Sequence, residues 1–142
     1  MKTGNVIALA SRIREKANRL IVSELAKRGI SGIVPSHGDI LIRLFDGQRY
    51  TMKDIAERIH RTKPTVTILV DKLVDLGYVV KEKSVEDSRV TFVALTEAGL
   101  ALQPVFEEIS HKLNTAVYRG LSDNQAEVLE AMLQKINNNL DI

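Results

Sequence analysis

The stretch "YVVKEKSVEDSRVTFVALTEAG", residues 78–99, is the part of the sequence that says most about the fold. Two runs of β-branched and aromatic residues flank a short acidic and polar segment, which is the pattern of a β-hairpin. Arg89 lies near the tip of this hairpin, two residues after Asp87, and the stretch ends on Leu-Thr directly before a new helical pattern. The sequence therefore predicts one projecting hairpin, with an arginine near its tip, in a chain that is otherwise rich in helix formers.

Four helical patterns precede the hairpin. In each of them apolar residues recur three and four positions apart, and residues that start or end helices separate them. We expect Thr51 and Thr62 to cap the third and fourth helices, Pro64 to lie in the first turn of the fourth, and Gly77 to end it. The four helices are expected within residues 5–29, 35–45, 52–60 and 62–76.

The third and fourth helices are short and are joined by a tight turn, as in a helix-turn-helix. Two ordinary packed helices would produce the same pattern. The hairpin that follows at once favours the more specific interpretation, because a helix-turn-helix followed by a two-stranded wing is a winged-helix arrangement. In that arrangement the second helix is suited to the major groove of DNA.

Two further helices are expected after the hairpin, over residues 97–119 and 123–140. Pro104 falls within the first two turns of the former and is expected to kink it. Ser122 and Gln125 form a capping box at the start of the latter. The apolar stripes at both ends of the chain exceed what a winged helix needs for its own core. They predict either a larger monomeric core or a dimer, and the dimer is favoured because one recognition helix contacts few bases.

The outward face of the fourth helix follows from its spacing of about 100° per residue. Its N-terminal half offers hydroxyls, an ammonium group and free backbone N–H groups, which attract phosphate and can contact base edges. Its C-terminal half presents Asp71 and Asp75, which phosphates repel. Only the first two turns are therefore expected to enter a groove.

Arg89 is placed to enter the neighbouring minor groove, where narrow A·T-rich stretches attract arginine. Asp87 can accept a hydrogen bond from the guanidinium group and fix its direction. Lys81 and Lys83 are expected to lie along phosphates. The alternative is a solvated surface pair between Asp87 and Arg89, which contributes little to stability.

The segment "DSRVTFVALTEAG", residues 87–99, resembles the wing signature of the multiple antibiotic resistance regulator (MarR) family. "TVTILVDKL", residues 65–73, is similar to the recognition helix of that family, and Gly77-Tyr78-Val79 is similar to the exit from it. The resemblance covers nearly the whole chain. Two positions depart from it, because family members often carry a basic residue at the position of Ile68 and a second arginine at that of Ser88.

The resemblance implies a dimeric winged-helix transcription regulator, usually a repressor that a small ligand releases from DNA. It also implies that the first helix and the last two interdigitate between subunits. A two-fold dimer matches a palindromic operator whose half-sites lie about one helical turn apart. Each missing basic contact at Ile68 and Ser88 is expected to lower affinity and to flatten its salt dependence.

The expected fold is mainly α with a small β-hairpin wing, a winged helix-turn-helix with N- and C-terminal dimerisation helices. Residues 1–142 are expected to form a single MarR-type unit, with residues 36–96 as the DNA-binding region and residues 1–34 and 97–142 as the dimerisation region. The expected partners are double-stranded DNA, a second copy of the chain and a small-molecule effector. The expected DNA-binding residues are Thr62, Lys63, Pro64, Thr65, Thr67, Ile68, Lys72, Lys81, Lys83, Asp87 and Arg89.

Composition and charge exclude several other classes of protein. The chain has 142 residues and no cysteine, so disulfides and thiolate catalysis are excluded. No Gly-rich phosphate loop or metalloprotease motif is present, and no enzyme is expected. No signal peptide or membrane span is apparent, which favours the cytoplasm. Residues 1–46 are predominantly basic and residues 91–142 predominantly acidic, which suits an anionic partner that touches part of the molecule.

The histidines leave one alternative open within the same fold. His60 is expected at the bend of the helix-turn-helix. His111 follows Glu107 by four residues on one helical face, a spacing that suits metal ligation. The favoured interpretation has no metal or other cofactor. One alternative is a metal-responsive regulator of the same fold. The other is a winged helix that contacts only protein. The candidate metal ligands are Glu24, His37, Glu107 and His111.

Overall fold

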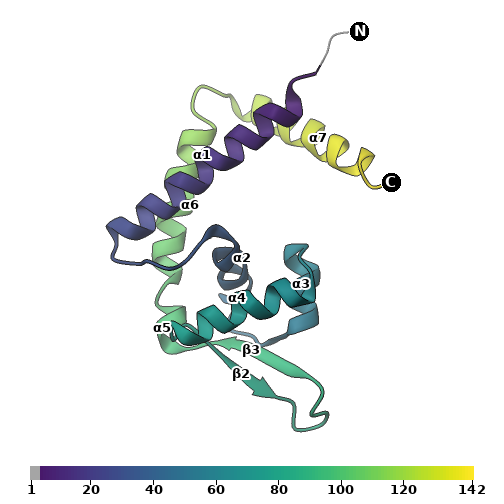
Figure 1. Ribbon diagram of the computed structural model, residues 1–142. Coiled ribbons are helices and arrows are strands. Elements are labelled where there is room, and N and C mark those ends of the chain that lie inside the picture. The colour runs from purple at the N-terminus through teal and green to yellow at the C-terminus, as the bar shows by residue number, and fades with distance from the viewer. Residues whose placement is uncertain (1–3) are drawn as a thin grey trace. The chain divides into compact units, whose positions relative to one another are not determined.

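A computed structural model describes residues 4–142 of the chain, as a mainly helical protein with a small antiparallel sheet (Figure 1). Residues up to Ile109 form one compact unit, and Ser110–Ile142 form a second. The predicted fold class is confirmed. The elements in order are α1 (Val6–Lys27), α2 (Pro35–Leu44), β1 (Tyr50–Thr51), α3 (Met52–Ile59), α4 (Lys63–Asp75), β2 (Val79–Lys83), β3 (Thr91–Leu95), α5 (Glu97–Leu100), α6 (Gln103–Val117) and α7 (Asp123–Asn139).

The predicted helix caps are present. The Thr51 hydroxyl oxygen accepts the N–H of Asp54 at 3.0 Å, and that of Thr62 accepts the N–H of Thr65 at 3.4 Å. Side-chain oxygens at these positions satisfy N–H groups that have no partner within the helix. After α4, Gly77 has a φ of +83°, a left-handed conformation that glycine adopts without strain.

Two features of the fold differ from the expectation. A short strand, β1, precedes α3 and pairs with β3, so the sheet is three-stranded in the order β1-β3-β2. The predicted helix over residues 97–119 is interrupted rather than kinked, because α5 ends at Leu100 and α6 begins at Gln103. Pro104 thus lies in the first turn of a new helix, where its missing N–H leaves no hydrogen bond unmade.

The core of the first unit is apolar and is contributed by all its larger elements. Helix α4 buries Val66, Val70 and Leu73, and Leu69 packs partly buried against the same core. The other buried apolar side chains are Leu25, Ile33, Ile40, Leu41, Leu44, Ile55, Val79, Val93, Leu102, Phe106 and Ile109. Their burial fixes which face of α4 points outward.

The wing, defined as residues 79–95, is joined to the end of α4 by hydrogen bonds around Thr96. The Thr96 hydroxyl donates to the carbonyl oxygen of Gly77 at 2.6 Å, and its backbone N–H donates to that of Tyr78 at 3.0 Å. The N–H of Gly99 in turn donates to the Thr96 hydroxyl oxygen. A Cβ atom on Gly99 would lie 2.0 Å from the Tyr78 carbonyl oxygen, so only glycine fits there. The wing extends beyond the helices α2–α4 (Figure 1).

The second unit consists of the end of α6 and all of α7, joined at a turn that contains Gly120 (φ +80°). The Ser122–Gln125 capping box opens α7 as predicted. The Tyr118 hydroxyl donates to the carboxylate of Glu130. No side chain of α7 is buried. Across residues 4–142, no helix is long and apolar enough to cross a membrane.

Candidate functional site

The first two turns of α4 form the exposed face that the sequence predicted. Lys63, Pro64 and Thr65 are exposed, and 71% of Ile68 is accessible to solvent. Val66 and Val70 lie on the opposite face with no accessible surface. The helix thus presents a mixed surface of hydroxyl, ammonium and apolar groups.

The hydroxyls on this face have defined hydrogen bonds. The Thr62 hydroxyl donates to the Thr65 hydroxyl oxygen at 2.9 Å. The Thr67 hydroxyl donates to the backbone carbonyl oxygen of Lys63 at 3.0 Å. Since each hydroxyl has one proton, Thr62 and Thr67 can only accept a further hydrogen bond in this arrangement, whereas the Thr65 hydroxyl can donate one.

A hollow of about 420 Å³ lies between the start of α4 and the wing. It brings together four of the predicted DNA-binding residues, three of which are lysines. Their ammonium groups create a positive potential in one recess, which attracts an anionic ligand. The residues that line it are Met52, Lys63, Thr67, Lys81, Lys83 and Thr91.

Lys81 has a specific partner at this hollow. Its Nζ atom lies 2.6 Å from Oδ1 of Asp71 on α4. The ion pair joins β2 to α4 and reduces the negative charge that Asp71 presents on the outward face. The sequence predicts that Lys81 lies along phosphates, which stays a prediction, and the structure places the carboxylate of Asp71 beside it.

The side chain of Lys72 runs in another direction. Its Nζ would lie 3.9 Å from a Cβ on Gly32, in the loop before α2, and it is not among the residues of the hollow. Burial lowers the pKa of His37, and the charge of Lys72 adds to that effect. The structure therefore does not bring Lys72 together with the other predicted contacts, and its role on DNA stays a prediction.

The tip of the wing is ordered by its own polar side chains. The Ser84 hydroxyl oxygen accepts the N–H groups of Glu86 and Asp87, both at 3.2 Å. The carboxylate of Asp87 accepts the backbone N–H of Arg89 at 3.0 Å and two guanidinium N–H groups, at 3.1 and 3.2 Å. These hydrogen bonds hold the pKa of Asp87 below its usual value.

The predicted hydrogen bond between Asp87 and Arg89 is therefore confirmed. The side chain of Arg89 remains 88% exposed, so its remaining N–H groups are available to an external partner. The carboxylate fixes the direction of the guanidinium group without covering it.

Sequence reasoning missed two residues that line the hollow, Met52 and Thr91. Thr91 lies directly opposite Lys83 in the hairpin register. Pairing the two predicted strands residue by residue could have placed Thr91 there, whereas Met52 follows β1, which the sequence did not predict. The sequence also missed Arg49, whose guanidinium lies 4.2 Å from the ring centroid of Phe92 and forms an ion pair with Glu82 at 3.8 Å.

The four candidate metal ligands do not come together. Within residues 4–142, no group of three or more histidine and acidic side chains could hold a metal ion. Glu24 is buried and accepts hydrogen bonds from Lys27 and Arg28. The Nδ1 atom of His37 accepts the N–H of Val34 at 2.9 Å and so caps α2. Burial lowers the pKa of His37, and the nearby Lys72 ammonium lowers it further.

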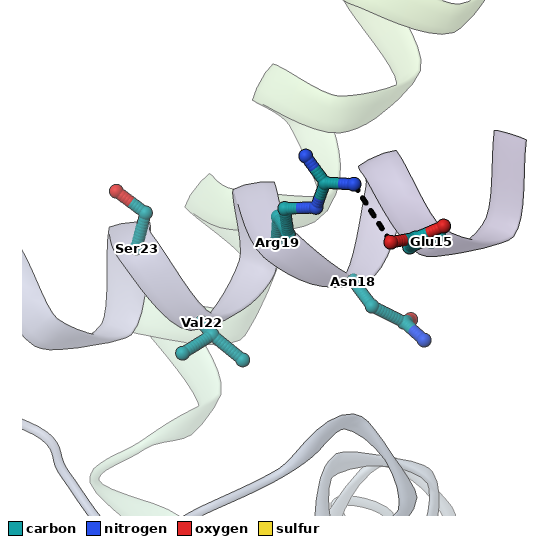
Figure 2. Close-up of a pocket in the computed structure, with 5 residues that line it drawn as sticks. All are labelled: Glu15, Asn18, Arg19, Val22 and Ser23. Carbon is teal, nitrogen blue, oxygen red and sulfur yellow. Dashed lines mark hydrogen bonds and ion pairs between the residues drawn. The ribbon is translucent and has the colours of Figure 1, made fainter. Parts of the chain in front are cut away.

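A second hollow, of about 470 Å³, lies against α1. All its lining side chains belong to that one helix: Glu15, Asn18, Arg19, Val22 and Ser23. Figure 2 shows Arg19 reaching back to Glu15, at 2.8 Å, while Asn18 and Val22 point to the other side of the helix. The lining combines one apolar side chain with an amide, a hydroxyl and the ion pair between Arg19 and Glu15.

Comparisons with known proteins agree with this geometry. The model of the MarR family matches residues 33–91. The HTH-type transcriptional repressor YetL of Bacillus subtilis is 30% identical over 132 residues, which are 92% of this chain and 77% of YetL. The chain belongs to the MarR family. The part matched by the family model runs from just before α2 to the start of β3, and so includes every residue of the hollow beside α4.

Two solved MarR-family structures share the fold over nearly the whole chain. The S. aureus MepR–DNA complex has a TM-score of 0.87 and 25% sequence identity, covering 99% of this chain and 100% of MepR. A MarR mutant from E. coli, complexed with operator DNA, has a TM-score of 0.81 and 20% identity, covering 96% of this chain and 99% of that one. The curated MarR-family relatives are transcriptional regulators rather than enzymes.

Proposed function

We propose that this MarR-family protein is a sequence-specific DNA-binding repressor that binds a palindromic operator as a homodimer. A small-molecule effector releases the repressor from the operator. The observation that carries the proposal is the lysine-lined hollow between α4 and the wing, beside the exposed first turns of α4. MepR and the E. coli MarR mutant are named as DNA complexes, which supports the same role here.

The proposed contacts divide into two kinds. Lys63, Lys81 and Lys83 line the hollow and supply charge for backbone phosphates, which position the protein without reading sequence. The N-terminus of α4 adds the backbone N–H of Lys63, which favours an anion, because Pro64 has no N–H and that of Thr65 donates to the Thr62 hydroxyl. Thr65 and Ile68 are exposed on the first two turns and are available to base edges in the major groove.

The wing tip is proposed to enter the minor groove. Arg89 is exposed, and Asp87 holds it in one orientation, so little side-chain entropy is lost when it binds. A narrow A·T-rich minor groove has an enhanced negative potential that attracts an inserted arginine. The family signature around this position, residues 87–99, supports the assignment.

The terminal helices are proposed to form the dimer interface, with residues 36–96 as the DNA-binding region and residues 1–34 and 97–142 as the dimerisation region. Contiguous exposed apolar surface marks interaction sites, and an amphipathic helix needs packing for stability. The second unit buries no apolar side chain, and α1 also leaves its N-terminal half open. The exposed large apolar residues of these helices include Val6, Ile7, Leu9, Ile13, Val128, Leu129, Met132 and Leu133.

Effector release is proposed from the family and from its named repressors, such as YetL. A ligand bound against the dimerisation helices would change the spacing of the two recognition helices, so that both could no longer reach their half-sites. The recess on α1 beside Asn18 and Val22 (Figure 2) is the place where we would look first for such a ligand.

Selection of bound fragments from genomic DNA by the purified protein tests the function directly. We expect recovered fragments to share a palindromic site and to be bound in fluorescence anisotropy with an affinity that falls steeply with salt. Lys63→Ala should weaken binding to all duplexes about equally. Lys135→Ala removes the same charge from α7 and serves as the control. A protein that enriches no fragment, and binds no duplex at low salt, would instead fit a winged helix that contacts only protein.

A further inference from the structure

The exposed face of α4 has no arginine, asparagine or glutamine. Arginine or lysine binds guanine, and asparagine or glutamine binds adenine, each through two hydrogen bonds. Of these residue types, helix α4, with the sequence KPTVTILVDKLVD, contains only lysine, at Lys63 and Lys72. Lys63 lines the hollow beside the wing and the Lys72 side chain lies near Gly32, so we looked for another group of the helix that can discriminate between bases.

The polar groups that α4 does carry are already partly engaged. The Thr67 hydroxyl donates to its own helix, and the Thr62 hydroxyl donates to Thr65. Asp71 pairs with Lys81, and the Lys72 side chain lies against the loop at Gly32. Lys63 lines the positive hollow beside the wing, where phosphate is the natural partner. Apart from the Lys63 ammonium group, the Thr65 hydroxyl is the polar side chain of the first two turns that can still donate to a base.

The most prominent group on this face is apolar. Ile68 is 71% exposed although it lies in the middle of a well-ordered helix, next to the fully buried Val66 and Val70. Pro64 is exposed four residues earlier, on the same side of the helix. The two positions are about 6 Å apart along the helix axis, which is close to two base-pair steps of about 3.4 Å.

In the major groove the apolar partner for such a surface is the C5-methyl group of thymine. We propose that Ile68, with Pro64 beside it, reads thymine methyl groups at one or two adjacent T·A pairs in each operator half-site. This inference rests on the proposed DNA-binding function and names the bases that this site selects.

Deoxyuridine in place of thymine tests the contact, because it removes the methyl group and leaves the Watson–Crick hydrogen bonds unchanged. Duplexes would be chosen by selection from a random library, and each half-site thymine would then be replaced singly. At the read positions we expect wild-type affinity to fall about fourfold for each methyl group lost, the effect of exposing one buried methylene-sized group.

Two protein variants, each measured on the thymine and deoxyuridine duplexes, test whether Ile68 makes the methyl contact. Ile68→Ala should bind the thymine duplex more weakly than wild type and should bind the thymine and deoxyuridine duplexes equally. Ile42→Ala, which truncates an isoleucine 48% exposed on α2, should keep the wild-type response to deoxyuridine. Circular dichroism would show that both variants are folded, which is expected because both side chains are largely exposed.

The outcomes are distinguishable. Selected half-sites without a common T·A pair, or a wild-type protein that binds every deoxyuridine duplex as well as its thymine counterpart, would overturn the methyl contact while leaving DNA binding in place. An Ile68→Ala variant that still distinguishes the two duplexes would overturn the role of Ile68. A protein that binds no duplex would overturn the proposed function and this inference together.

Discussion

The ammonium group of Lys81, on the wing, lies 2.6 Å from a carboxylate oxygen of Asp71, on the outward face of α4. Both side chains are about half exposed, at 40% and 52%, so the pair contributes little to stability, within about 1 kcal/mol. The pair instead lowers the net positive charge of the hollow. It holds the carboxylate of Asp71 next to a surface that is proposed to approach phosphates, and it occupies Lys81, one of the three lysines of the hollow.

Asp71→Asn should therefore strengthen duplex binding. The substitution removes a negative charge from the DNA-facing side and releases Lys81, so affinity should rise and the salt slope should steepen by about one unit. Fluorescence anisotropy across a series of salt concentrations measures both. Asp141→Asn, near the C-terminus, is the matched control. A weaker or unchanged affinity would show that the pair lies away from DNA or orients Lys81 for binding.

Arg89→Ala should weaken operator binding by roughly 1–3 kcal/mol, the scale of a good base contact, with little effect on folding. The guanidinium group is exposed and its loss opens no cavity. Arg89→Lys should recover only part of the affinity, because an ammonium group cannot make the same paired hydrogen bonds with Asp87. Equal operator affinities of the wild-type, Arg89→Ala and Arg89→Lys proteins would show that the Arg89 side chain does not contribute to DNA binding.

Gly99→Ala should destabilise the protein by more than about 2 kcal/mol. The added Cβ would approach the Tyr78 carbonyl oxygen to 2.0 Å, where the wing meets α5. Urea denaturation measures the loss. Gly4→Ala is the control, since nothing lies within 4 Å of the added Cβ there. Equal stability of the two variants would mean that the junction between Tyr78 and Gly99 can relax.

Stability should fall on mild acidification because of His37. Its neutral Nδ1 atom accepts the N–H of Val34, and burial lowers its pKa in the folded state. The unfolded chain therefore binds the proton more readily, near the usual pKa of about 6.5. The stabilisation is complete above that pH and is lost as pH falls through the lower folded-state pKa.

Urea denaturation at pH 7.5 and at pH 5 measures this dependence. His37→Gln keeps an acceptor for the cap but has no proton to gain, so it should lose part of the pH dependence. A variant with the same pH profile as wild type would show that other groups cause the acid destabilisation.

Met132→Lys should disrupt the dimer. Met132 is 54% exposed on α7, in an apolar face that the second unit leaves open. A charge buried in that interface without a partner is strongly unfavourable. Analytical ultracentrifugation should show a smaller species, which binds the palindrome much more weakly. Gln134→Lys adds the same charge to the same helix and serves as the control. If the Met132→Lys protein remains fully dimeric, the dimer interface does not include this face of α7.

The local fold was largely readable from the sequence. Thr51, Thr62 and Ser122 cap helices as expected, and Gly77 takes the left-handed conformation. These features depend on near neighbours in the chain. The bond from Thr62 to Thr65, for example, spans three residues and leaves a clear signal in the sequence.

Features that depend on distant residues were not readable. Strand β1 has two residues, too few for a periodic pattern, and exists because β3 pairs with it. The ion pair of Lys81 with Asp71 and the path of Lys72 toward Gly32 depend on how β2 and the α1–α2 loop pack on α4. The sequence therefore predicted the exposed first turns of α4 and the hydrogen bond between Asp87 and Arg89, but it could not show that Lys81 pairs with Asp71 or that Lys72 extends toward Gly32.

Hydroxyl-radical footprinting on a selected operator shows whether two copies of α4 and of Arg89 approach one face of a duplex together. We expect two protected patches on one face, about one helical turn apart, and loss of protection in the adjoining minor grooves when Arg89 is replaced by alanine. Protection confined to a single patch, or an identical footprint for the Arg89→Ala protein, would contradict this arrangement.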